Sequence, residues 1–218
     1  MMRIIFFDLD GTLINSPSTE KTFLRHLITE GKLSIKQYWH AALFVLRWFF
    51  TYKQYVFIKD KAYLSGLPVA EITALAVRLA YDELLKRIRP DIQERLLAHQ
   101  KAGDVTVLIT GSHEFIAKIF AEHLDFDAFY GTKCAVKDGY FTAAPPIQHP
   151  FRDDKLAIAK KVCAQYQINI KDCVAYGDSF NDSMLLHAVG QPIVVKPDYF
   201  LHYTAHKEGW EILGNFKC

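Results

Sequence analysis

The chain has 218 residues, enough for one domain or for one domain that carries an insertion. Half of its residues are hydrophobic, 23% are charged and 14% are aromatic, a composition that excludes a disordered or fibrous protein. The net charge of +2 is too small to indicate a basic surface for nucleic acid, so nucleic acid is not an expected partner.

Residues 3–7 are predicted to form a buried strand, because they make a short apolar run that ends at Asp8. From Pro17 to Arg87 the apolar residues recur at helical spacing, which predicts one helix after another. Beyond this block, strands and helices alternate. The expected strands are 105–109, 173–176 and 193–195, the expected helices are 91–102, 154–166 and 198–208, and a hairpin is expected at 128–143. The alternation predicts an α/β fold, a parallel sheet with helices on both faces, and the helical block predicts an insertion after the first strand.

The segment from Tyr38 to Ile58 is the most apolar and aromatic part of the chain. Arg47 and Lys53 lie inside it, and a spanning helix needs about 20 nearly uncharged residues, so no transmembrane segment is expected. The favoured interpretation is a helix buried in a bundle. The alternative is an apolar wall that faces lipid or a greasy substrate, and contact with a membrane surface belongs to that alternative.

The cysteines form no CxxC pair and have no histidine at zinc spacing. They are Cys134, Cys163, Cys173 and Cys218. This pattern predicts reduced thiols rather than a disulfide framework or a metal site. An acidic residue stands as early as Asp8, which argues against a secretory signal, and a cytoplasmic location is expected.

Paired acidic residues follow two of the predicted strands. Asp8 and Asp10 come at the end of the first strand, and Asp178 and Asp182 follow the strand at 173–176. Ligands of open α/β sheets bind at the carboxyl ends of the strands, so these carboxylates are expected to converge there. Buried carboxylates require a cation or a catalytic use, and oxygen ligands suit Mg²⁺ together with a phosphate.

Two further features favour an anionic ligand. Thr110, Gly111 and Ser112 end the strand at 105–109 and are expected to open the next helix, where backbone N–H groups can bind an anion. Lys155 stands near the predicted start of a helix, where the helix dipole disfavours a cation. It is therefore expected to pair with acidic groups in the site.

Four sequence motifs together resemble one family. They are FFDLDGTL at 6–13, LITGS at 108–112, the isolated Lys155, and YGDSFNDSMLL at 176–186. In this order they are similar to motifs one to four of the haloacid dehalogenase-like (HAD) hydrolase superfamily. The helical block resembles the C1-type cap of its phosphoserine-phosphatase-like branch. The resemblance implies a Rossmannoid core of residues 1–16 and 88–218 and an all-helical cap of residues 17–87.

The resemblance also implies catalytic and metal-binding roles. Asp8 would be the nucleophile that forms an aspartyl phosphate, and Asp10 would act first as the general acid and then as the general base. Mg²⁺ would be held by Asp8, by Asp10 through its backbone carbonyl, and by Asp178.

The phosphate-binding residues follow from the same resemblance. The phosphoryl oxygens would be bound by Thr110, Gly111 and Lys155, with Asn181 bracing the phosphate side. Asp182 would orient Lys155 or metal-bound water.

The expected function is Mg²⁺-dependent hydrolysis of a small organic phosphate ester. A lipid-like substrate such as phosphatidylglycerophosphate, a mutase, and a binding scaffold without turnover are the alternatives. In the phosphoserine phosphatases a glutamate receives the substrate amine; here its position holds Pro17, and Glu20 comes three residues later.

Substrate specificity is expected to depend on groups of the cap and the pocket mouth. The residues predicted for it are Arg47, Trp48 and His113. The oligomeric state is not predicted.

Overall fold

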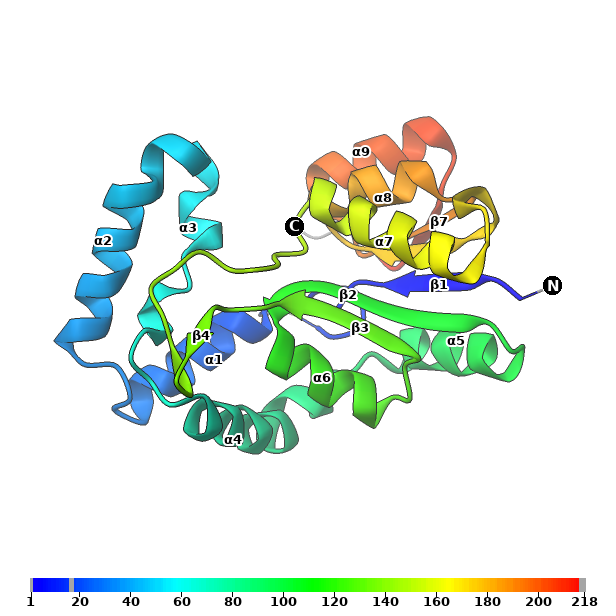
Figure 1. Ribbon diagram of the computed structural model, residues 1–218. Helices are drawn as coiled ribbons and strands as arrows, with labels where there is room; N and C mark the ends of the chain where they lie inside the picture. The colour runs from blue at the N-terminus through cyan, green and yellow to red at the C-terminus, as the bar shows by residue number, and fades with distance from the viewer. Residues whose placement is uncertain (1, 16–17, 216–218) are drawn as a thin grey trace.

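The computed structural model describes residues 2–15 and 18–215 and has a six-stranded parallel sheet in the order β3-β2-β1-β6-β7-β8 (Figure 1). Its strands are β1 (Ile4–Phe7), β2 (Val105–His113), β3 (Ala128–Thr132), β6 (Val174–Gly177), β7 (Gln191–Val195) and β8 (Glu211–Leu213). The sheet confirms the predicted α/β fold class. β1 pairs with both β2 and β6, so it lies at the centre of the sheet.

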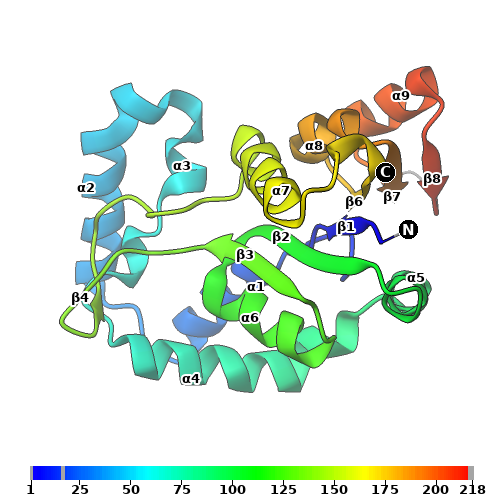
Figure 2. The ribbon, with the colours of Figure 1, turned by 45° about the vertical axis from the view of Figure 1, so that its right-hand side comes forward.

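Helices cover both faces of the sheet (Figure 2). One face carries α5 (Pro90–Lys101) and α6 (Glu114–His123), and the other carries α7 (Asp153–Tyr166), α8 (Ser183–Ala188) and α9 (Tyr199–Glu208). Alternate residues of β1 enter the two layers, because successive side chains of a strand point to opposite faces. Ile5 and Phe7 belong to the first cluster, and Ile4 and Phe6 belong to the second.

A mostly helical segment separates β1 from α5. It contains α1 (Thr19–Thr29), α2 (Ile35–Tyr52), η1 (Lys53–Tyr55), α3 (Val56–Lys59), η2 (Ala62–Leu64), α4 (Val69–Leu79), the π-helical turn η3 (Ala80–Leu84) and η4 (Leu85–Arg87). We call residues 19–87 the helical insertion. Its expected start, between residues 16 and 17, lies outside the described residues, as does Cys218.

A short β-hairpin from the second half of the chain packs against the helical insertion. It consists of β4 (Val136–Lys137) and β5 (Tyr140–Phe141). The backbone N–H of Gly66 donates to the Phe141 carbonyl at 2.9 Å, and the N–H of Phe141 donates to the Leu67 carbonyl at 3.1 Å. The predicted hairpin at 128–143 is therefore confined to residues 136–141, and it packs on the helical insertion.

Two predicted elements differ from the structure in the region of β2 and β3. Residues 128–132 were expected to form one arm of a hairpin, but they form β3 and pair in parallel with β2. β2 itself continues to His113, and α6 begins only at Glu114. The residues Thr110 to Ser112 therefore belong to the strand, past a shift in its pairing register after Ile109, and do not open the helix.

The aromatic segment is not buried in a bundle. Within α2 only Gln37 and Phe44 are buried, whereas most of its large apolar side chains are exposed. In the described part of the chain, no helix combines the length and the hydropathy required to cross a bilayer.

Candidate active site

The centre of the candidate site is Lys155, a buried lysine between two carboxylates. Its Nζ lies 2.6 Å from Asp8 Oδ1 and 2.5 Å from Asp182 Oδ1. Lys155 comes from the first turn of α7, Asp8 follows β1, and Asp182 ends the 3₁₀ turn η6 (Phe180–Asp182). The carboxyl ends of β1 and β6 meet at this edge, so groups far apart in sequence form one cluster.

Asp182 is fixed on its other side by backbone donors. Its Oδ2 accepts hydrogen bonds from the N–H groups of Asp178 and Ser179, each at 3.2 Å, and from Ser179 Oγ at 3.2 Å. Gly177 makes room for this arrangement, because a Cβ at that position would lie 2.7 Å from the Cβ of Asp182. Both oxygens of Asp182 are thus engaged by the protein.

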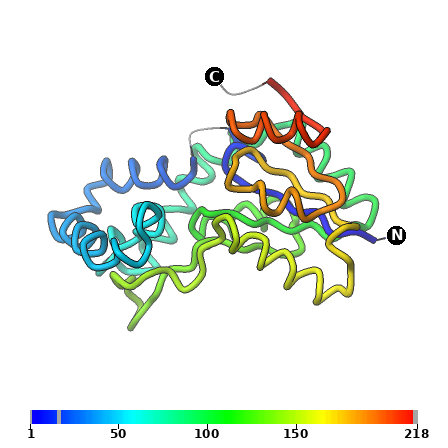
Figure 3. Tube along the Cα trace, turned by 90° about the horizontal axis from the view of Figure 1, so that it is seen from above, coloured from blue at the N-terminus to red at the C-terminus, as the bar shows by residue number. Residues whose placement is uncertain are grey.

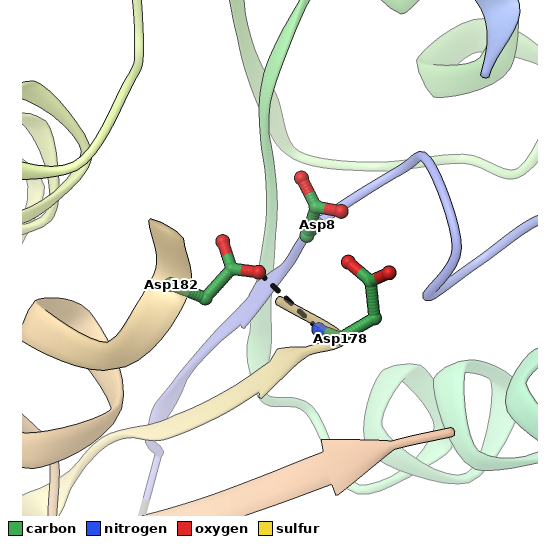
Figure 4. A group of neighbouring side chains, drawn as sticks. All are labelled: Asp8, Asp178 and Asp182. Carbon is green, nitrogen blue, oxygen red and sulfur yellow. Dashed lines mark hydrogen bonds between the residues drawn. The ribbon is translucent and has the colours of Figure 1, made fainter. Parts of the chain in front are cut away.

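Three acidic groups gather at the same point: Asp8, Asp178 and Asp182 are buried, and one carboxylate oxygen of each lies within 4.8 Å of the others (Figure 4). Burial raises the pKa of Asp8 well above its usual value, Lys155 opposes this shift, and the charges of Asp182 and Asp178 add to it. Burial alone would lower the pKa of Lys155, but the charges of Asp182 and Asp8 raise it above its ordinary value. One ammonium group therefore faces three carboxyl groups.

The donor set of this cluster fits a hard divalent cation. Three buried carboxyl groups share one lysine, and the raised pKa of Asp8 shows that a negative charge there is unfavourable without a further cation. Oxygen atoms are the ligands that Mg²⁺ prefers. Asp8 and Asp178 line the cavity described below, whereas Asp182 is held by Lys155 and backbone donors, so Asp8 and Asp178 are the carboxylates placed to hold the ion.

Asp10 lies two residues beyond Asp8 and has a different set of partners. Its carboxylate accepts from the backbone N–H of Thr19 at 2.6 Å, from Thr19 Oγ1 at 3.1 Å and from Ser112 Oγ. Burial raises the pKa of Asp10 above its usual value, against the hydrogen bonds from Ser112 and Thr19. A raised pKa brings a carboxyl group closer to the range that suits a general acid.

A cavity of about 570 Å³ opens onto these groups. This volume lies within the range of roughly 300–1,000 Å³ that is typical of small-molecule sites. The cavity is lined by the predicted catalytic and metal-binding residues Asp8, Asp10 and Asp178 and by the predicted phosphate-binding residues Thr110, Gly111, Lys155 and Asn181. The structure thus brings all of these residues to one pocket, and Asp182 contacts the pocket residue Lys155.

The helical insertion contributes a polar group that the sequence analysis did not assign to the site. Glu20 lines the cavity, and its Oε1 accepts a hydrogen bond from Lys61, which is 4% exposed. Tyr63 OH lies 3.3 Å from the same oxygen. The sequence carried no signal for this contact, because Glu20 and Lys61 are 41 residues apart.

His149 is a second cavity residue that the sequence did not indicate. Its Nδ1 lies 2.8 Å from the hydroxyl of Thr132, which donates to the Gly111 carbonyl. Within the described ranges its Nε2 has no hydrogen-bond partner. Burial lowers the pKa of His149 to about 3, so its ring is neutral.

The three residues predicted to determine specificity lie away from the cavity. Arg47 is exposed on α2, with its guanidinium 5.7 Å from the ring centroid of Trp48, and Trp48 packs against Phe44 and Tyr52. His113 does not lie at the pocket mouth but is completely buried, with Nε2 2.6 Å from Tyr63 OH. Sequence spacing could not predict these positions, since they depend on how the insertion packs.

The comparison with protein families identifies the class. The model of the haloacid dehalogenase-like hydrolases matches residues 5–187, which include every group of the cluster. The chain belongs to this family. Within it the chain resembles the phosphoserine-phosphatase-like branch, as its motifs predicted, and two of its relatives are named phosphoserine phosphatase.

Two curated relatives illustrate the similarity. A phosphoserine phosphatase of Mycobacterium tuberculosis is 32% identical over 155 residues, which are 71% of this chain and 50% of that protein. The chain thus spans about half the length of that relative. A histidinol-phosphatase of Neisseria meningitidis is 26% identical over 230 residues, which cover 100% of both chains.

Solved structures share the fold. A protein of unknown function from Bordetella pertussis superimposes with a TM-score of 0.80 at 21% identity, over 98% of this chain and 99% of that chain. A phosphoserine phosphatase in a phospho-aspartyl intermediate analogue form gives a TM-score of 0.65 at 23% identity, over 97% and 92% of the two chains.

Gly177→Ala is expected to damage the cluster without touching any of its charged groups. The added methyl group would overlap the Asp182 side chain, so Asp182 must move away from Lys155. Overpacking of this kind costs about 1–3 kcal/mol. Chemical denaturation should show this loss, and a variant as stable as the parent protein would contradict the geometry.

His113 is expected to make the protein less stable in acid. Burial, with the charge of Lys61, lowers the pKa of His113 well below its usual value, so below about pH 6.5 the unfolded chain binds the extra proton and the folded chain does not. The free energy of unfolding should therefore fall as the pH drops from 7 to 5, and His113→Gln should reduce that slope. Denaturation curves at several pH values measure it, with the exposed His123→Gln as a control that keeps the parent slope.

Proposed function

We propose that the chain is a Mg²⁺-dependent phosphomonoesterase that forms an aspartyl phosphate on Asp8 and acts on a small organic phosphate. The observation that carries the proposal is the position of Asp8, whose Oδ1 lies 2.6 Å from Lys155 Nζ at the floor of the cavity. The three neighbouring acidic groups and the separately held Asp10 complete a set of side chains suited to phosphoryl transfer.

In the first step a carboxylate oxygen of Asp8 attacks phosphorus, and the bond to the ester oxygen breaks. Asp10 gives its proton to that leaving oxygen, which departs as an alcohol. The raised pKa of Asp10 supports this role, and its hydrogen bonds to Thr19 and Ser112 hold the carboxyl group in place.

In the second step water attacks the phosphorus of the aspartyl phosphate. Asp10, now ionised, takes a proton from the water, the bond to Asp8 breaks, and inorganic phosphate leaves. Asp8 is thereby restored as a carboxylate and Asp10 as an acid, so protons and electrons balance over the cycle.

Positive charge and N–H donors stabilise the phosphoryl group in both steps. Lys155 and the residues Thr110, Gly111 and Asn181 line the cavity beside Asp8, where they would bind the phosphoryl oxygens. Asp8 and Asp178, with the backbone carbonyl of Asp10, would hold Mg²⁺. When bound, the ion would neutralise negative charge on the phosphoryl oxygens.

The helical insertion would act as the cap that closes over the substrate. Glu20 and Ile58 of the insertion line the cavity, whereas the proposed catalytic residues Asp8 and Asp10 follow the central strand of the sheet. Because the carboxylate of Glu20 is already paired with the buried Lys61, it is a poor receptor for a substrate amine. This pairing favours organic phosphates other than phosphoserine.

Asp8→Asn is expected to abolish phosphate release from an aryl phosphate, because the amide is no nucleophile and the substitution adds no bulk. Removal of a nucleophile from a concerted site lowers the rate by about 10⁶-fold. Lys160→Ala, an exposed lysine on the same helix as Lys155, serves as the control and should be near neutral. Substantial activity in Asp8→Asn would place the nucleophile elsewhere.

Removal of divalent metal is expected to abolish turnover. Dialysis against a chelator should eliminate phosphate release, and Mg²⁺ should restore it. Ca²⁺ should support activity poorly, because it takes six to eight oxygen ligands at longer distances than Mg²⁺ does. Full activity in the chelated protein would disprove the metal assignment.

A further inference from the structure

The exposed face of α2 carries several large apolar side chains. α2 lies at the end of the molecule away from the sheet, with α3 between it and the core (Figures 1 and 3). The opposite face of the helix is anchored: Phe44 is buried with Val56 and Ala62, and Trp48 packs against this cluster. The exposed side chains therefore project from a fixed helix.

An apolar stripe runs along that exposed face. Its members follow one another at intervals of three or four residues, which places them on one side of a helix. They are Ile35, Trp39, Leu43, Leu46 and Phe50. Phe50 is 88% exposed and Leu46 is 74% exposed, so nothing in the described part of the chain covers them.

Positive charge accompanies the stripe. Residues 31–59 contain five lysine or arginine residues and no aspartate or glutamate. Lys32 pairs with Glu71, and Lys59 lies 3.7 Å from Asp154. Lys36, Arg47 and Lys53 are exposed, and no acidic side chain among residues 2–15 and 18–215 forms an ion pair with any of the three.

We propose that this face of α2 docks on the surface of an anionic lipid bilayer. A helix with tryptophan, phenylalanine and leucine on one side, flanked by lysine and arginine, lies in the interfacial plane of a membrane. Its apolar side chains enter the boundary between headgroups and acyl chains, and its cations meet the anionic headgroups. The proposal concerns binding of the protein to a membrane surface, and it does not depend on the proposed phosphatase activity.

A second copy of the chain is a poorer occupant of this face. Symmetric pairing of two α2 helices would bring their cations close together without a compensating acidic group from the same segment. An 18-residue helix is about 27 Å long and about 10 Å wide, so the stripe offers only a few hundred Å². Stable interfaces bury about 800 Å² on each partner.

Co-sedimentation with vesicles tests the proposal. The full chain is mixed with vesicles of phosphatidylcholine alone or of phosphatidylcholine with phosphatidylglycerol, at low and at high salt. Binding is expected only to the anionic vesicles and should weaken as salt rises, because exposed charges are screened. Lys36→Gln with Lys53→Gln should weaken it by about fivefold for each cation removed.

The apolar stripe is tested by Trp39→Ser with Phe50→Ser. Both side chains are largely exposed, so circular dichroism should show the parent fold, while vesicle binding falls by at least about tenfold. Tyr203→Ser is the matched control, since Tyr203 of α9 is 67% exposed and lies off the stripe. It should bind vesicles as the parent protein does.

Three outcomes would overturn the proposal. The chain could fail to bind anionic vesicles, or the Trp39→Ser and Phe50→Ser variant could bind as well as the parent protein. In the third outcome sedimentation velocity without lipid would show a dimer that this double variant dissociates. That last result would assign the stripe to a second copy of the chain.

Discussion

The ion pair that Lys155 makes with Asp8 and Asp182 is the interaction on which the rest of the site depends. It joins the end of β1, the first turn of α7 and the turn η6, which are far apart in the sequence. Breaking a buried pair by removing one partner costs about 3–5 kcal/mol, because the remaining charge stays buried. The ammonium group of Lys155 therefore offsets the negative charge of the two carboxylates and positions Asp8, the proposed nucleophile. It also links the residues that follow β1 with those that follow β6.

The parallel sheet explains why this cluster can form. Parallel strands present their carboxyl ends at one edge, so the residues after β1 and β6 meet without any contact in sequence. The chain leaves the sheet at this edge after β1, and the helical insertion that follows contributes Glu20 to the cavity lining. The lining of the cavity thus comes from two parts of the chain, the sheet edge and the helical insertion.

Local patterns were sufficient to predict much of the core but not its long-range pairing. The predicted ranges for β1, α7 and α9 agree with the structure to within one residue, because each has a clear apolar pattern or end signal. The strand β3 was misassigned because its partner β2 is separated from it by the helix α6, whereas the local turn signal favoured a hairpin. For α2, apolar residues on all sides left open which face packs, and contacts such as that of Phe44 with Val56 and Ala62 decide it. The contact between Glu20 and Lys61 could not be predicted from the sequence either, because the two residues are 41 positions apart.

The most direct test of the account is to find the phosphoryl group on the protein. An Asp10→Asn variant lacks the proposed base of the second step, so acid quenching during turnover of an aryl phosphate should trap the intermediate. Mass spectrometry of the peptides should then locate one phosphoryl group on Asp8. A phosphoryl group on another residue, or turnover by this variant without any phosphorylated peptide, would contradict the account.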